Sequence, residues 1–135
     1  MARRRTDPAA GRAAVAAWQA DPEAVTGPVL ATAVRYLLEE LADRAPGNAV
    51  EVRVPPLGVT QCVPGPRHTR GTPPNVVETD PATWLALATG ALPWADALVG
   101  GRVRASGLRT DLSPWLPLVG DGDGGPPGEA GTVEP

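Results

Sequence analysis

The chain has 135 residues, 12 basic and 15 acidic side chains and a formal net charge of −3, with one cysteine and one histidine. This length allows a single domain with one core. A single cysteine excludes an internal disulfide and a multi-cysteine metal site, and no metal or other cofactor is expected. Neither a signal peptide nor a run of the ~20 apolar residues that span a membrane is visible. We therefore expect a soluble cytoplasmic protein without stable membrane insertion.

The charge is unevenly distributed along the chain. Residues 1–12 carry a net +3, residues 120–135 carry −4, and the stretch between them carries −2. A domain that binds nucleic acid as its main partner is expected to be basic, so this distribution argues against such a partner. The three consecutive arginines at 3–5 could contact phosphate, but a solvated chain end is the simpler interpretation.

Two helices are predicted in the first third of the chain. Asp7-Pro8 places an N-cap and a first-turn proline before a helix that runs to about Ala20. Asp21-Pro22 repeats this start signal for a short turn. A longer helix is predicted over 28–45, where Pro46-Gly47 ends it. Its apolar residues form one continuous stripe at helical spacing, namely Leu30, Ala33, Val34, Leu37, Leu38 and Leu41.

The pattern then changes to that of three strands. Two helices, a fourth strand and a last helical segment follow them. VEVRV at 50–54 alternates apolar and charged residues, which indicates a half-buried strand. Further strands are predicted at 57–63, 75–78 and 103–106. Helices are predicted from Pro81 to Gly90 and from 93 to 99. A last helical segment is predicted from Asp111 or Ser113 to 119, and it carries Trp115, Leu116, Leu118 and Val119.

This order of elements predicts an α+β domain. Because the connections between successive strands are short, we expect an antiparallel sheet of about four to five strands, with helices covering one face. The expected organisation is an N-terminal helical segment at 1–26 with a basic start, a domain at 27–119, and a tail at 120–135. The tail is rich in Gly, Pro and acids, and is predicted to be disordered.

The stretch from Val76 to Val119 resembles the C-terminal half of sterol carrier protein domains. An acidic residue opens a helix, a glycine follows, a second helix ends in glycine, and a strand of the form G-x-V-x-A-x-G comes next. The matching positions are Asp80, Gly90, Gly101, Val103, Ala105 and Gly107, with the helices of Trp84, Trp94–Val99 and Trp115. Ala105 stands where the family often has a larger aliphatic residue. The helix at 28–45 and the strands at 50–54 and 57–63 extend the resemblance to about 28–119, in the variant common in high-GC bacteria.

The resemblance implies a non-catalytic binding fold that holds a lipid, fatty acyl chain or sterol-like molecule between the sheet and its helices. The residues that would line such a cavity are Trp84, Leu85, Ala88, Leu92, Trp94, Leu98, Val99, Val103, Trp115 and Leu118. Pockets for such ligands are mostly apolar, with a few polar groups at the mouth. The alternative is an ordinary filled core in which tryptophan serves as the large side chain, because the chain has no phenylalanine.

The stretch RHTRGTPPNVVETD at 67–80 gathers the polar groups that could carry chemistry. Arg67, His68 and Arg70 are candidates for holding a ligand headgroup, because guanidinium groups suit carboxylates and phosphates. Pairing of these arginines with acids of the protein itself is the alternative. Asp80 precedes Pro81 and is expected to be a helix N-cap.

An enzyme that uses Cys62, His68 and Glu78 as nucleophile, base and orienting group is the least favoured hypothesis. A lone cysteine on a strand is usually a small buried apolar residue. The second hypothesis, after lipid binding and before catalysis, is an interaction or dimerisation module with a filled core and no ligand. Such a module could form a homodimer or serve as the companion of an enzyme.

Overall fold

The computed structural model describes residues 5–65 and 75–119, which form ten helical and strand elements. The first third holds α1 (Pro8–Ala20), the 3₁₀ turn η1 (Pro22–Ala24) and α2 (Gly27–Arg44). Three strands follow, β1 (Val50–Val54), β2 (Gly58–Cys62) and β3 (Asn75–Thr79). The remaining elements are α3 (Pro81–Thr89), α4 (Trp94–Val99), β4 (Val103–Ser106) and the 3₁₀ turn η2 (Ser113–Trp115). The α+β class and most element positions agree with the sequence prediction.

The described strands form one four-stranded mixed sheet in the order β2-β1-β3-β4. β1 pairs antiparallel with β2, and β3 pairs antiparallel with β4, but β1 and β3 run parallel. The predicted purely antiparallel sheet is therefore wrong, because the third strand pairs with the first and not with its neighbour in sequence. Cys62 ends β2 opposite Val50, and Asn75 begins β3 opposite the same residue, so the chain only has to cross β1 at one end.

The sheet has an inner face that the helices cover and an outer face that carries charges. Val50, Val52 and Val54 alternate with Glu51 and Arg53 along β1, and only the valines are fully buried. We call the side of the valines the inner face and the side of Glu51 and Arg53 the outer face. This two-residue alternation is what one-sided burial of a strand requires.

Complementary charges line up across the outer face. Arg53 Nε lies 3.2 Å from Glu51 Oε2, and the strand register places Glu78 beside Arg53 and Arg104 beside Glu78. The hydrogen bond and charge of Glu51, with a smaller effect of Glu78, raise the pKa of Arg53 above its ordinary value. These groups are exposed to solvent, where such pairs contribute little to stability. Their main effect is to keep this face of the sheet in water.

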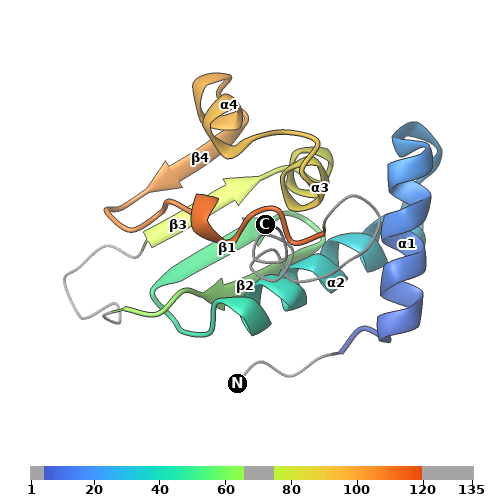
Figure 1. The fold of residues 1–135 in the computed structure, drawn as a ribbon, viewed down its shortest axis with the longest axis horizontal. Coiled ribbons are helices and arrows are strands. Elements are labelled where there is room, and N and C mark those ends of the chain that lie inside the picture. Colours follow the sequence, from blue (N-terminus) through green and yellow to red (C-terminus); the bar gives the residue numbers. More distant parts are fainter. Residues whose placement is uncertain (1–4, 66–74, 120–135) are drawn as a thin grey trace, which may run out of the picture.

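Helices α2 and α3 lie together over the inner face, and α1 packs against α2 (Figure 1). The predicted stripe of α2 is buried except at Leu30, which is partly buried. The Asp7 carboxylate accepts the Ala10 N–H at 3.0 Å as the cap of α1. α1 adds Ala14, Val15 and Trp18 to the core. No helix in the described part of the chain is both long and apolar enough to cross a bilayer.

A close approach of α1 and α2 depends on Gly11. A Cβ atom built on Gly11 would collide with ring atoms of Tyr36 and would lie 2.8 Å from the Tyr36 Cβ atom. Glycine in a helix interior costs about 1 kcal/mol relative to alanine. The absence of a side chain at Gly11 lets the backbone of α1 pack directly against the Tyr36 ring of α2, and this contact offsets the loss of helix propensity.

The predicted last helix is wrong. Only Ser113–Trp115 form a helical turn, and the chain then continues in an extended conformation from Leu116. Pro117 lacks the N–H that a helix would use, and the residue before a proline is driven to extended backbone angles. Residues 111–119 are called here the C-terminal segment. Apart from η2 this segment has no regular secondary structure, and it runs across the domain (Figure 1).

We predict that Gly11→Ala lowers the free energy of unfolding by about 1–3 kcal/mol, because the clash with Tyr36 outweighs the gain in helix propensity. Urea denaturation of the purified protein measures this change. In the background of Tyr36→Ala, which removes the ring but keeps the Cβ atom of residue 36, the same Gly11→Ala change should cost less. An equal loss in both backgrounds would contradict the contribution of the ring.

Candidate functional site

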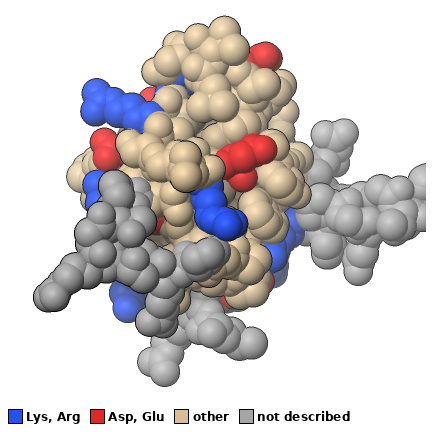
Figure 2. Space-filling view, turned by 90° about the vertical axis from the view of Figure 1, so that its left-hand side faces the viewer, with Lys and Arg blue, Asp and Glu red and all other residues tan. Residues whose placement is uncertain are grey.

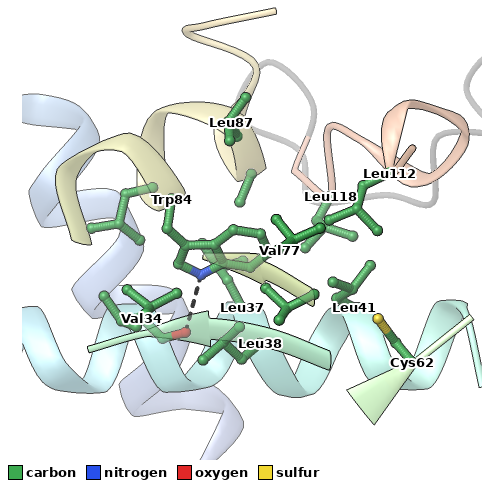
Figure 3. Close-up of a cluster of buried hydrophobic side chains, with 14 of the residues drawn as sticks. Val34, Leu37, Leu38, Leu41, Cys62, Val77, Trp84, Leu87, Leu112 and Leu118 are labelled. Carbon is green, nitrogen blue, oxygen red and sulfur yellow. Dashed lines mark hydrogen bonds between the residues drawn. The ribbon is translucent and has the colours of Figure 1, made fainter. Parts of the chain in front are cut away.

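A buried apolar cluster occupies the space between the inner face and the helices (Figure 3). α2 contributes Val34, Leu37 and Leu41 to this cluster, and β3 contributes Val77. Trp84 of α3 lies at its centre, 1% exposed, and its indole N–H donates a hydrogen bond to the Val34 carbonyl oxygen at 3.3 Å. This bond ties α3 to α2 and fixes the orientation of the largest side chain of the cluster.

The predicted ligand-lining residues divide into three groups. Six are buried, with exposed fractions of 9% or less, namely Trp84, Leu85, Ala88, Trp94, Val103 and Leu118. Leu92 and Trp115 are partly buried against this core, whereas Leu98 is 42% and Val99 is 91% exposed. The structure therefore brings the first group into the interior and leaves the end of α4 in solvent.

The C-terminal segment closes the cluster on the side of α3. The N–H groups of Leu118 and Val119 both donate to the Ala88 carbonyl oxygen, at 2.7 and 3.1 Å. Leu112 and Leu118 are wholly buried beside Trp84 and Val77 (Figure 3). The segment is thus held by two buried leucine side chains, by one shared acceptor, and by the partly buried Trp115, Leu116 and Val119.

The inner face is not covered along the whole of β4. Ala105 pairs with the buried Val77 and therefore points to the inner side, yet Ala105 is exposed. Val103, at the beginning of the same strand, is buried. The small side chain at 105 thus leaves an uncovered position at the margin of the apolar cluster. Figure 2 shows the molecule from the left-hand side of Figure 1, and the upper part of this surface is mostly free of charged groups.

A second open feature, which the sequence reading missed, lies at the opposite edge of the sheet. A cavity of about 950 Å³ separates α2 from β2 and from the start of the chain, and Arg35, Leu38, Glu39, Leu57 and Val59 are among its lining residues. Sequence patterns mark these residues only as parts of a helix and a hairpin. These residues line one cavity because of the way α1 packs against α2. A sequence pattern within a single helix or hairpin does not predict this packing.

The headgroup candidates Arg67, His68 and Arg70 lie outside the described residues. Their proposed role stays a prediction. The nearby Asp80 has the predicted role of a cap, since its carboxylate accepts the Thr83 N–H at 2.8 Å and the Thr83 hydroxyl at 2.9 Å. Arg102 also donates to this hydroxyl, at 3.0 Å. These contacts tie the start of α3 to the start of β4.

Cys62 does not have the environment of a nucleophile. It is wholly buried, and burial raises the pKa of the thiol to about 12. The register places Cys62 beside Val50 on the inner face and Glu78 beside Arg53 on the outer face. A direct contact between Cys62 and Glu78 is therefore excluded. Among the described residues, no three His, Cys, Asp or Glu side chains gather as a possible metal site.

A one-sided sheet with its helices packed over an apolar cluster is the architecture of a small two-layer α+β domain. A family model described as "Bacterial SCP ortholog" matches residues 27–118, which is more than half of the chain. The chain therefore belongs to the sterol carrier protein family, as its sequence resemblance predicted. The match starts at α2, so α1 lies outside it. Comparison with curated proteins gives no significant match.

We predict that burial of Cys62 makes the protein less stable at high pH. Between about pH 9 and pH 12 the thiol ionises in the unfolded chain but stays protonated in the folded one. Each pH unit in this range then lowers the free energy of unfolding by up to about 1.4 kcal/mol. Urea denaturation at pH 8, 9 and 10 measures this slope.

Cys62→Ala provides the control for this prediction. The variant loses packing at every pH, but its stability should fall less steeply above pH 9 than that of the unchanged protein. Equal slopes for the two proteins would show that the thiol is not the group responsible.

Proposed function

We propose that this protein binds an apolar small molecule, such as a fatty acyl chain or another lipid, between the inner face of the sheet and the helices. No catalysis and no cofactor are part of this proposal. Membership of the sterol carrier protein family supports lipid binding in general. The observation that favours this particular place is the exposed Ala105 on the inner face, next to the buried Val77.

Entry of a ligand at Ala105 requires the C-terminal segment to move. The cluster is packed, so an acyl chain would have to replace the side chains of Leu112 and Leu118. Exposing two leucines costs about 3–6 kcal/mol, whereas each buried methylene of a ligand contributes about 0.8 kcal/mol. A chain of about eight methylenes would already offset this cost. The proposal therefore favours long acyl chains over short ones.

Ala105→Trp tests the proposed entry, because the large side chain should cover the opening without disturbing a buried residue. We expect affinity for the neutral apolar dye Nile red to fall by at least about tenfold, measured by dye fluorescence. Native mass spectrometry of the unchanged protein would in parallel reveal any ligand retained through purification.

Ser106→Trp is the matched control. It places the same side chain on the next residue of β4, but on the outer face, since Ser106 pairs with Val76. This variant should bind Nile red like the unchanged protein. Equal binding by both tryptophan variants, or no binding of the dye by any of them, would contradict the proposal.

A second candidate function is that of an interaction module with a filled core. Two observations favour it: the predicted lining residues of α3 are packed without exposed surface, and large aliphatic side chains are exposed near β4. Val99 is 91% and Leu108 is 100% exposed. Exposed apolar groups of this kind are common at surfaces where proteins associate.

The association function makes a different prediction. If the protein forms a homodimer through the exposed apolar side chain before β4 or the one after it, light scattering after gel filtration should give twice the chain mass, and Val99→Asp or Leu108→Asp should return it to the monomer. Val29→Asp, at another exposed aliphatic residue on α2, is the control and should not change the mass. A monomeric mass for the unchanged protein would exclude the homodimer.

A further inference from the structure

The cavity between α2 and β2 combines a cation with aliphatic side chains. Its volume of about 950 Å³ is at the upper end of the range for small-molecule sites. α2 forms one wall and β2 with the preceding turn forms the other. Thr6 and Asp7, before α1, close one end. This position is separate from the apolar cluster around Trp84, and it includes residues that lie outside the family match.

Two cations, Arg5 and Arg35, line this cavity, and Arg35 is held in a fixed position. Its Nε donates to the Leu57 carbonyl oxygen at 2.6 Å, which anchors the guanidinium group to the turn between β1 and β2. Among the residues that the structure describes, no carboxylate lies within ion-pair distance of Arg35, and no acceptor is found for its two terminal NH₂ groups. A guanidinium fork held in this way is suited to a carboxylate or a phosphate.

The two acidic side chains of the cavity already have structural roles. Glu39 accepts the Thr6 N–H at 3.2 Å and the Thr6 hydroxyl at 3.1 Å, which fastens the start of the chain to α2. The Asp7 carboxylate caps α1 through the Ala10 N–H. Both acids are thereby held by donors of the protein, whereas the terminal groups of Arg35 remain for a ligand.

The remaining walls favour an aliphatic group. Leu38 and Ala42 lie at the base of the cavity and are 2% and 4% exposed, while Leu57 is partly buried. Thr60 of the edge strand β2 pairs with the buried Val52 and so faces α2 from the opposite wall, whereas Val59 pairs with Arg53 and points to the outer face. Gly58 cannot readily carry a side chain here, because its Cβ would lie 3.0 Å from Leu38 Cδ1.

We propose that this cavity is a binding site for an amphipathic anion, with the carboxylate or phosphate head on Arg35 and the aliphatic part along Leu38 and Leu57. The head is held by charge-assisted hydrogen bonds and the tail by burial. The site is distinct from the interior site proposed above, and it does not depend on movement of the C-terminal segment. Its expected ligands are amphiphiles, because polar residues line one side of the cavity and apolar residues the other.

Isothermal titration calorimetry with four probes tests this site. Decanoate and decyl phosphate carry the two possible heads, 1-decanol carries the same tail without charge, and inorganic phosphate carries a head without a tail. At least one of the anionic amphiphiles should bind about tenfold or more tightly than decanol, since hydrogen bonds to charged groups contribute this much. The tighter of the two anions identifies the head that Arg35 prefers. Inorganic phosphate binding as tightly as decyl phosphate would overturn the role of the tail.

Variants then assign the binding to this cavity. Arg35→Gln should reduce the affinity of the anion to that of decanol, whereas Arg35→Lys should restore most of it. Thr60→Trp changes a partly buried residue of the edge strand on the side that faces α2, and it should weaken binding of every amphiphile by filling the cavity. Arg104→Gln on the outer face and Val29→Trp on α2 are the matched controls and should have no effect.

The outcome is separable from that of the interior site. Ala105→Trp should leave anion binding in this cavity unchanged, whatever its effect on Nile red. Affinity that is unaffected by both Arg35→Gln and Thr60→Trp would overturn the proposal. If Arg35→Gln unfolds the protein, which thermal denaturation detects, the result with Thr60→Trp decides the question alone.

Discussion

The burial of Trp84 between the two covering helices and the sheet is the constraint on which the rest of the structure depends. Its side chain fills the centre of the cluster, and its N–H would be left without a partner if α2 did not offer the Val34 carbonyl oxygen. An unpaired buried donor costs about 1–3 kcal/mol, so the contact selects one position of α3 relative to α2. The Asp80 cap and its hydrogen bonds to Thr83 then determine where α3 begins.

This arrangement places the two open features of the domain at opposite edges of the sheet. At the centre, α2 and α3 cover β1 and β3 and leave no room. At one edge the inner face is uncovered at Ala105, and at the other edge the cavity beside Arg35 lies between α2 and β2. The outer face offers little to an apolar ligand, because Glu51, Arg53 and Glu78 keep it hydrated. Binding at the edges is therefore what the packing leaves possible.

The local parts of the fold could be predicted from the sequence, and the contacts between distant parts could not. Asp7 and Asp80 could be predicted as helix N-caps, because each caps its helix through an N–H only three residues further along the chain. The alternation of VEVRV shows which side of β1 is buried. The parallel pairing of β1 with β3 has no local signature, since any order of strands would bury the same side chains. For the same reason the sequence suggested lining residues on α3 but could not show that Trp84 and Leu85 pack without exposed surface.

The C-terminal segment shows how one local feature changes the behaviour of the whole site. The positions of Trp115, Leu116 and Leu118 fit a helical pattern, but Pro117 stops the helix after a single turn. A helix in this place would be a cooperative unit with its own hydrogen bonds, and moving it would expose a complete apolar face. The irregular segment is instead attached by the buried Leu112 and Leu118, by the shared Ala88 oxygen, and by partly buried side chains such as Trp115. The part of the structure that must move for a ligand to enter beneath it thus has no regular helix to move as a unit.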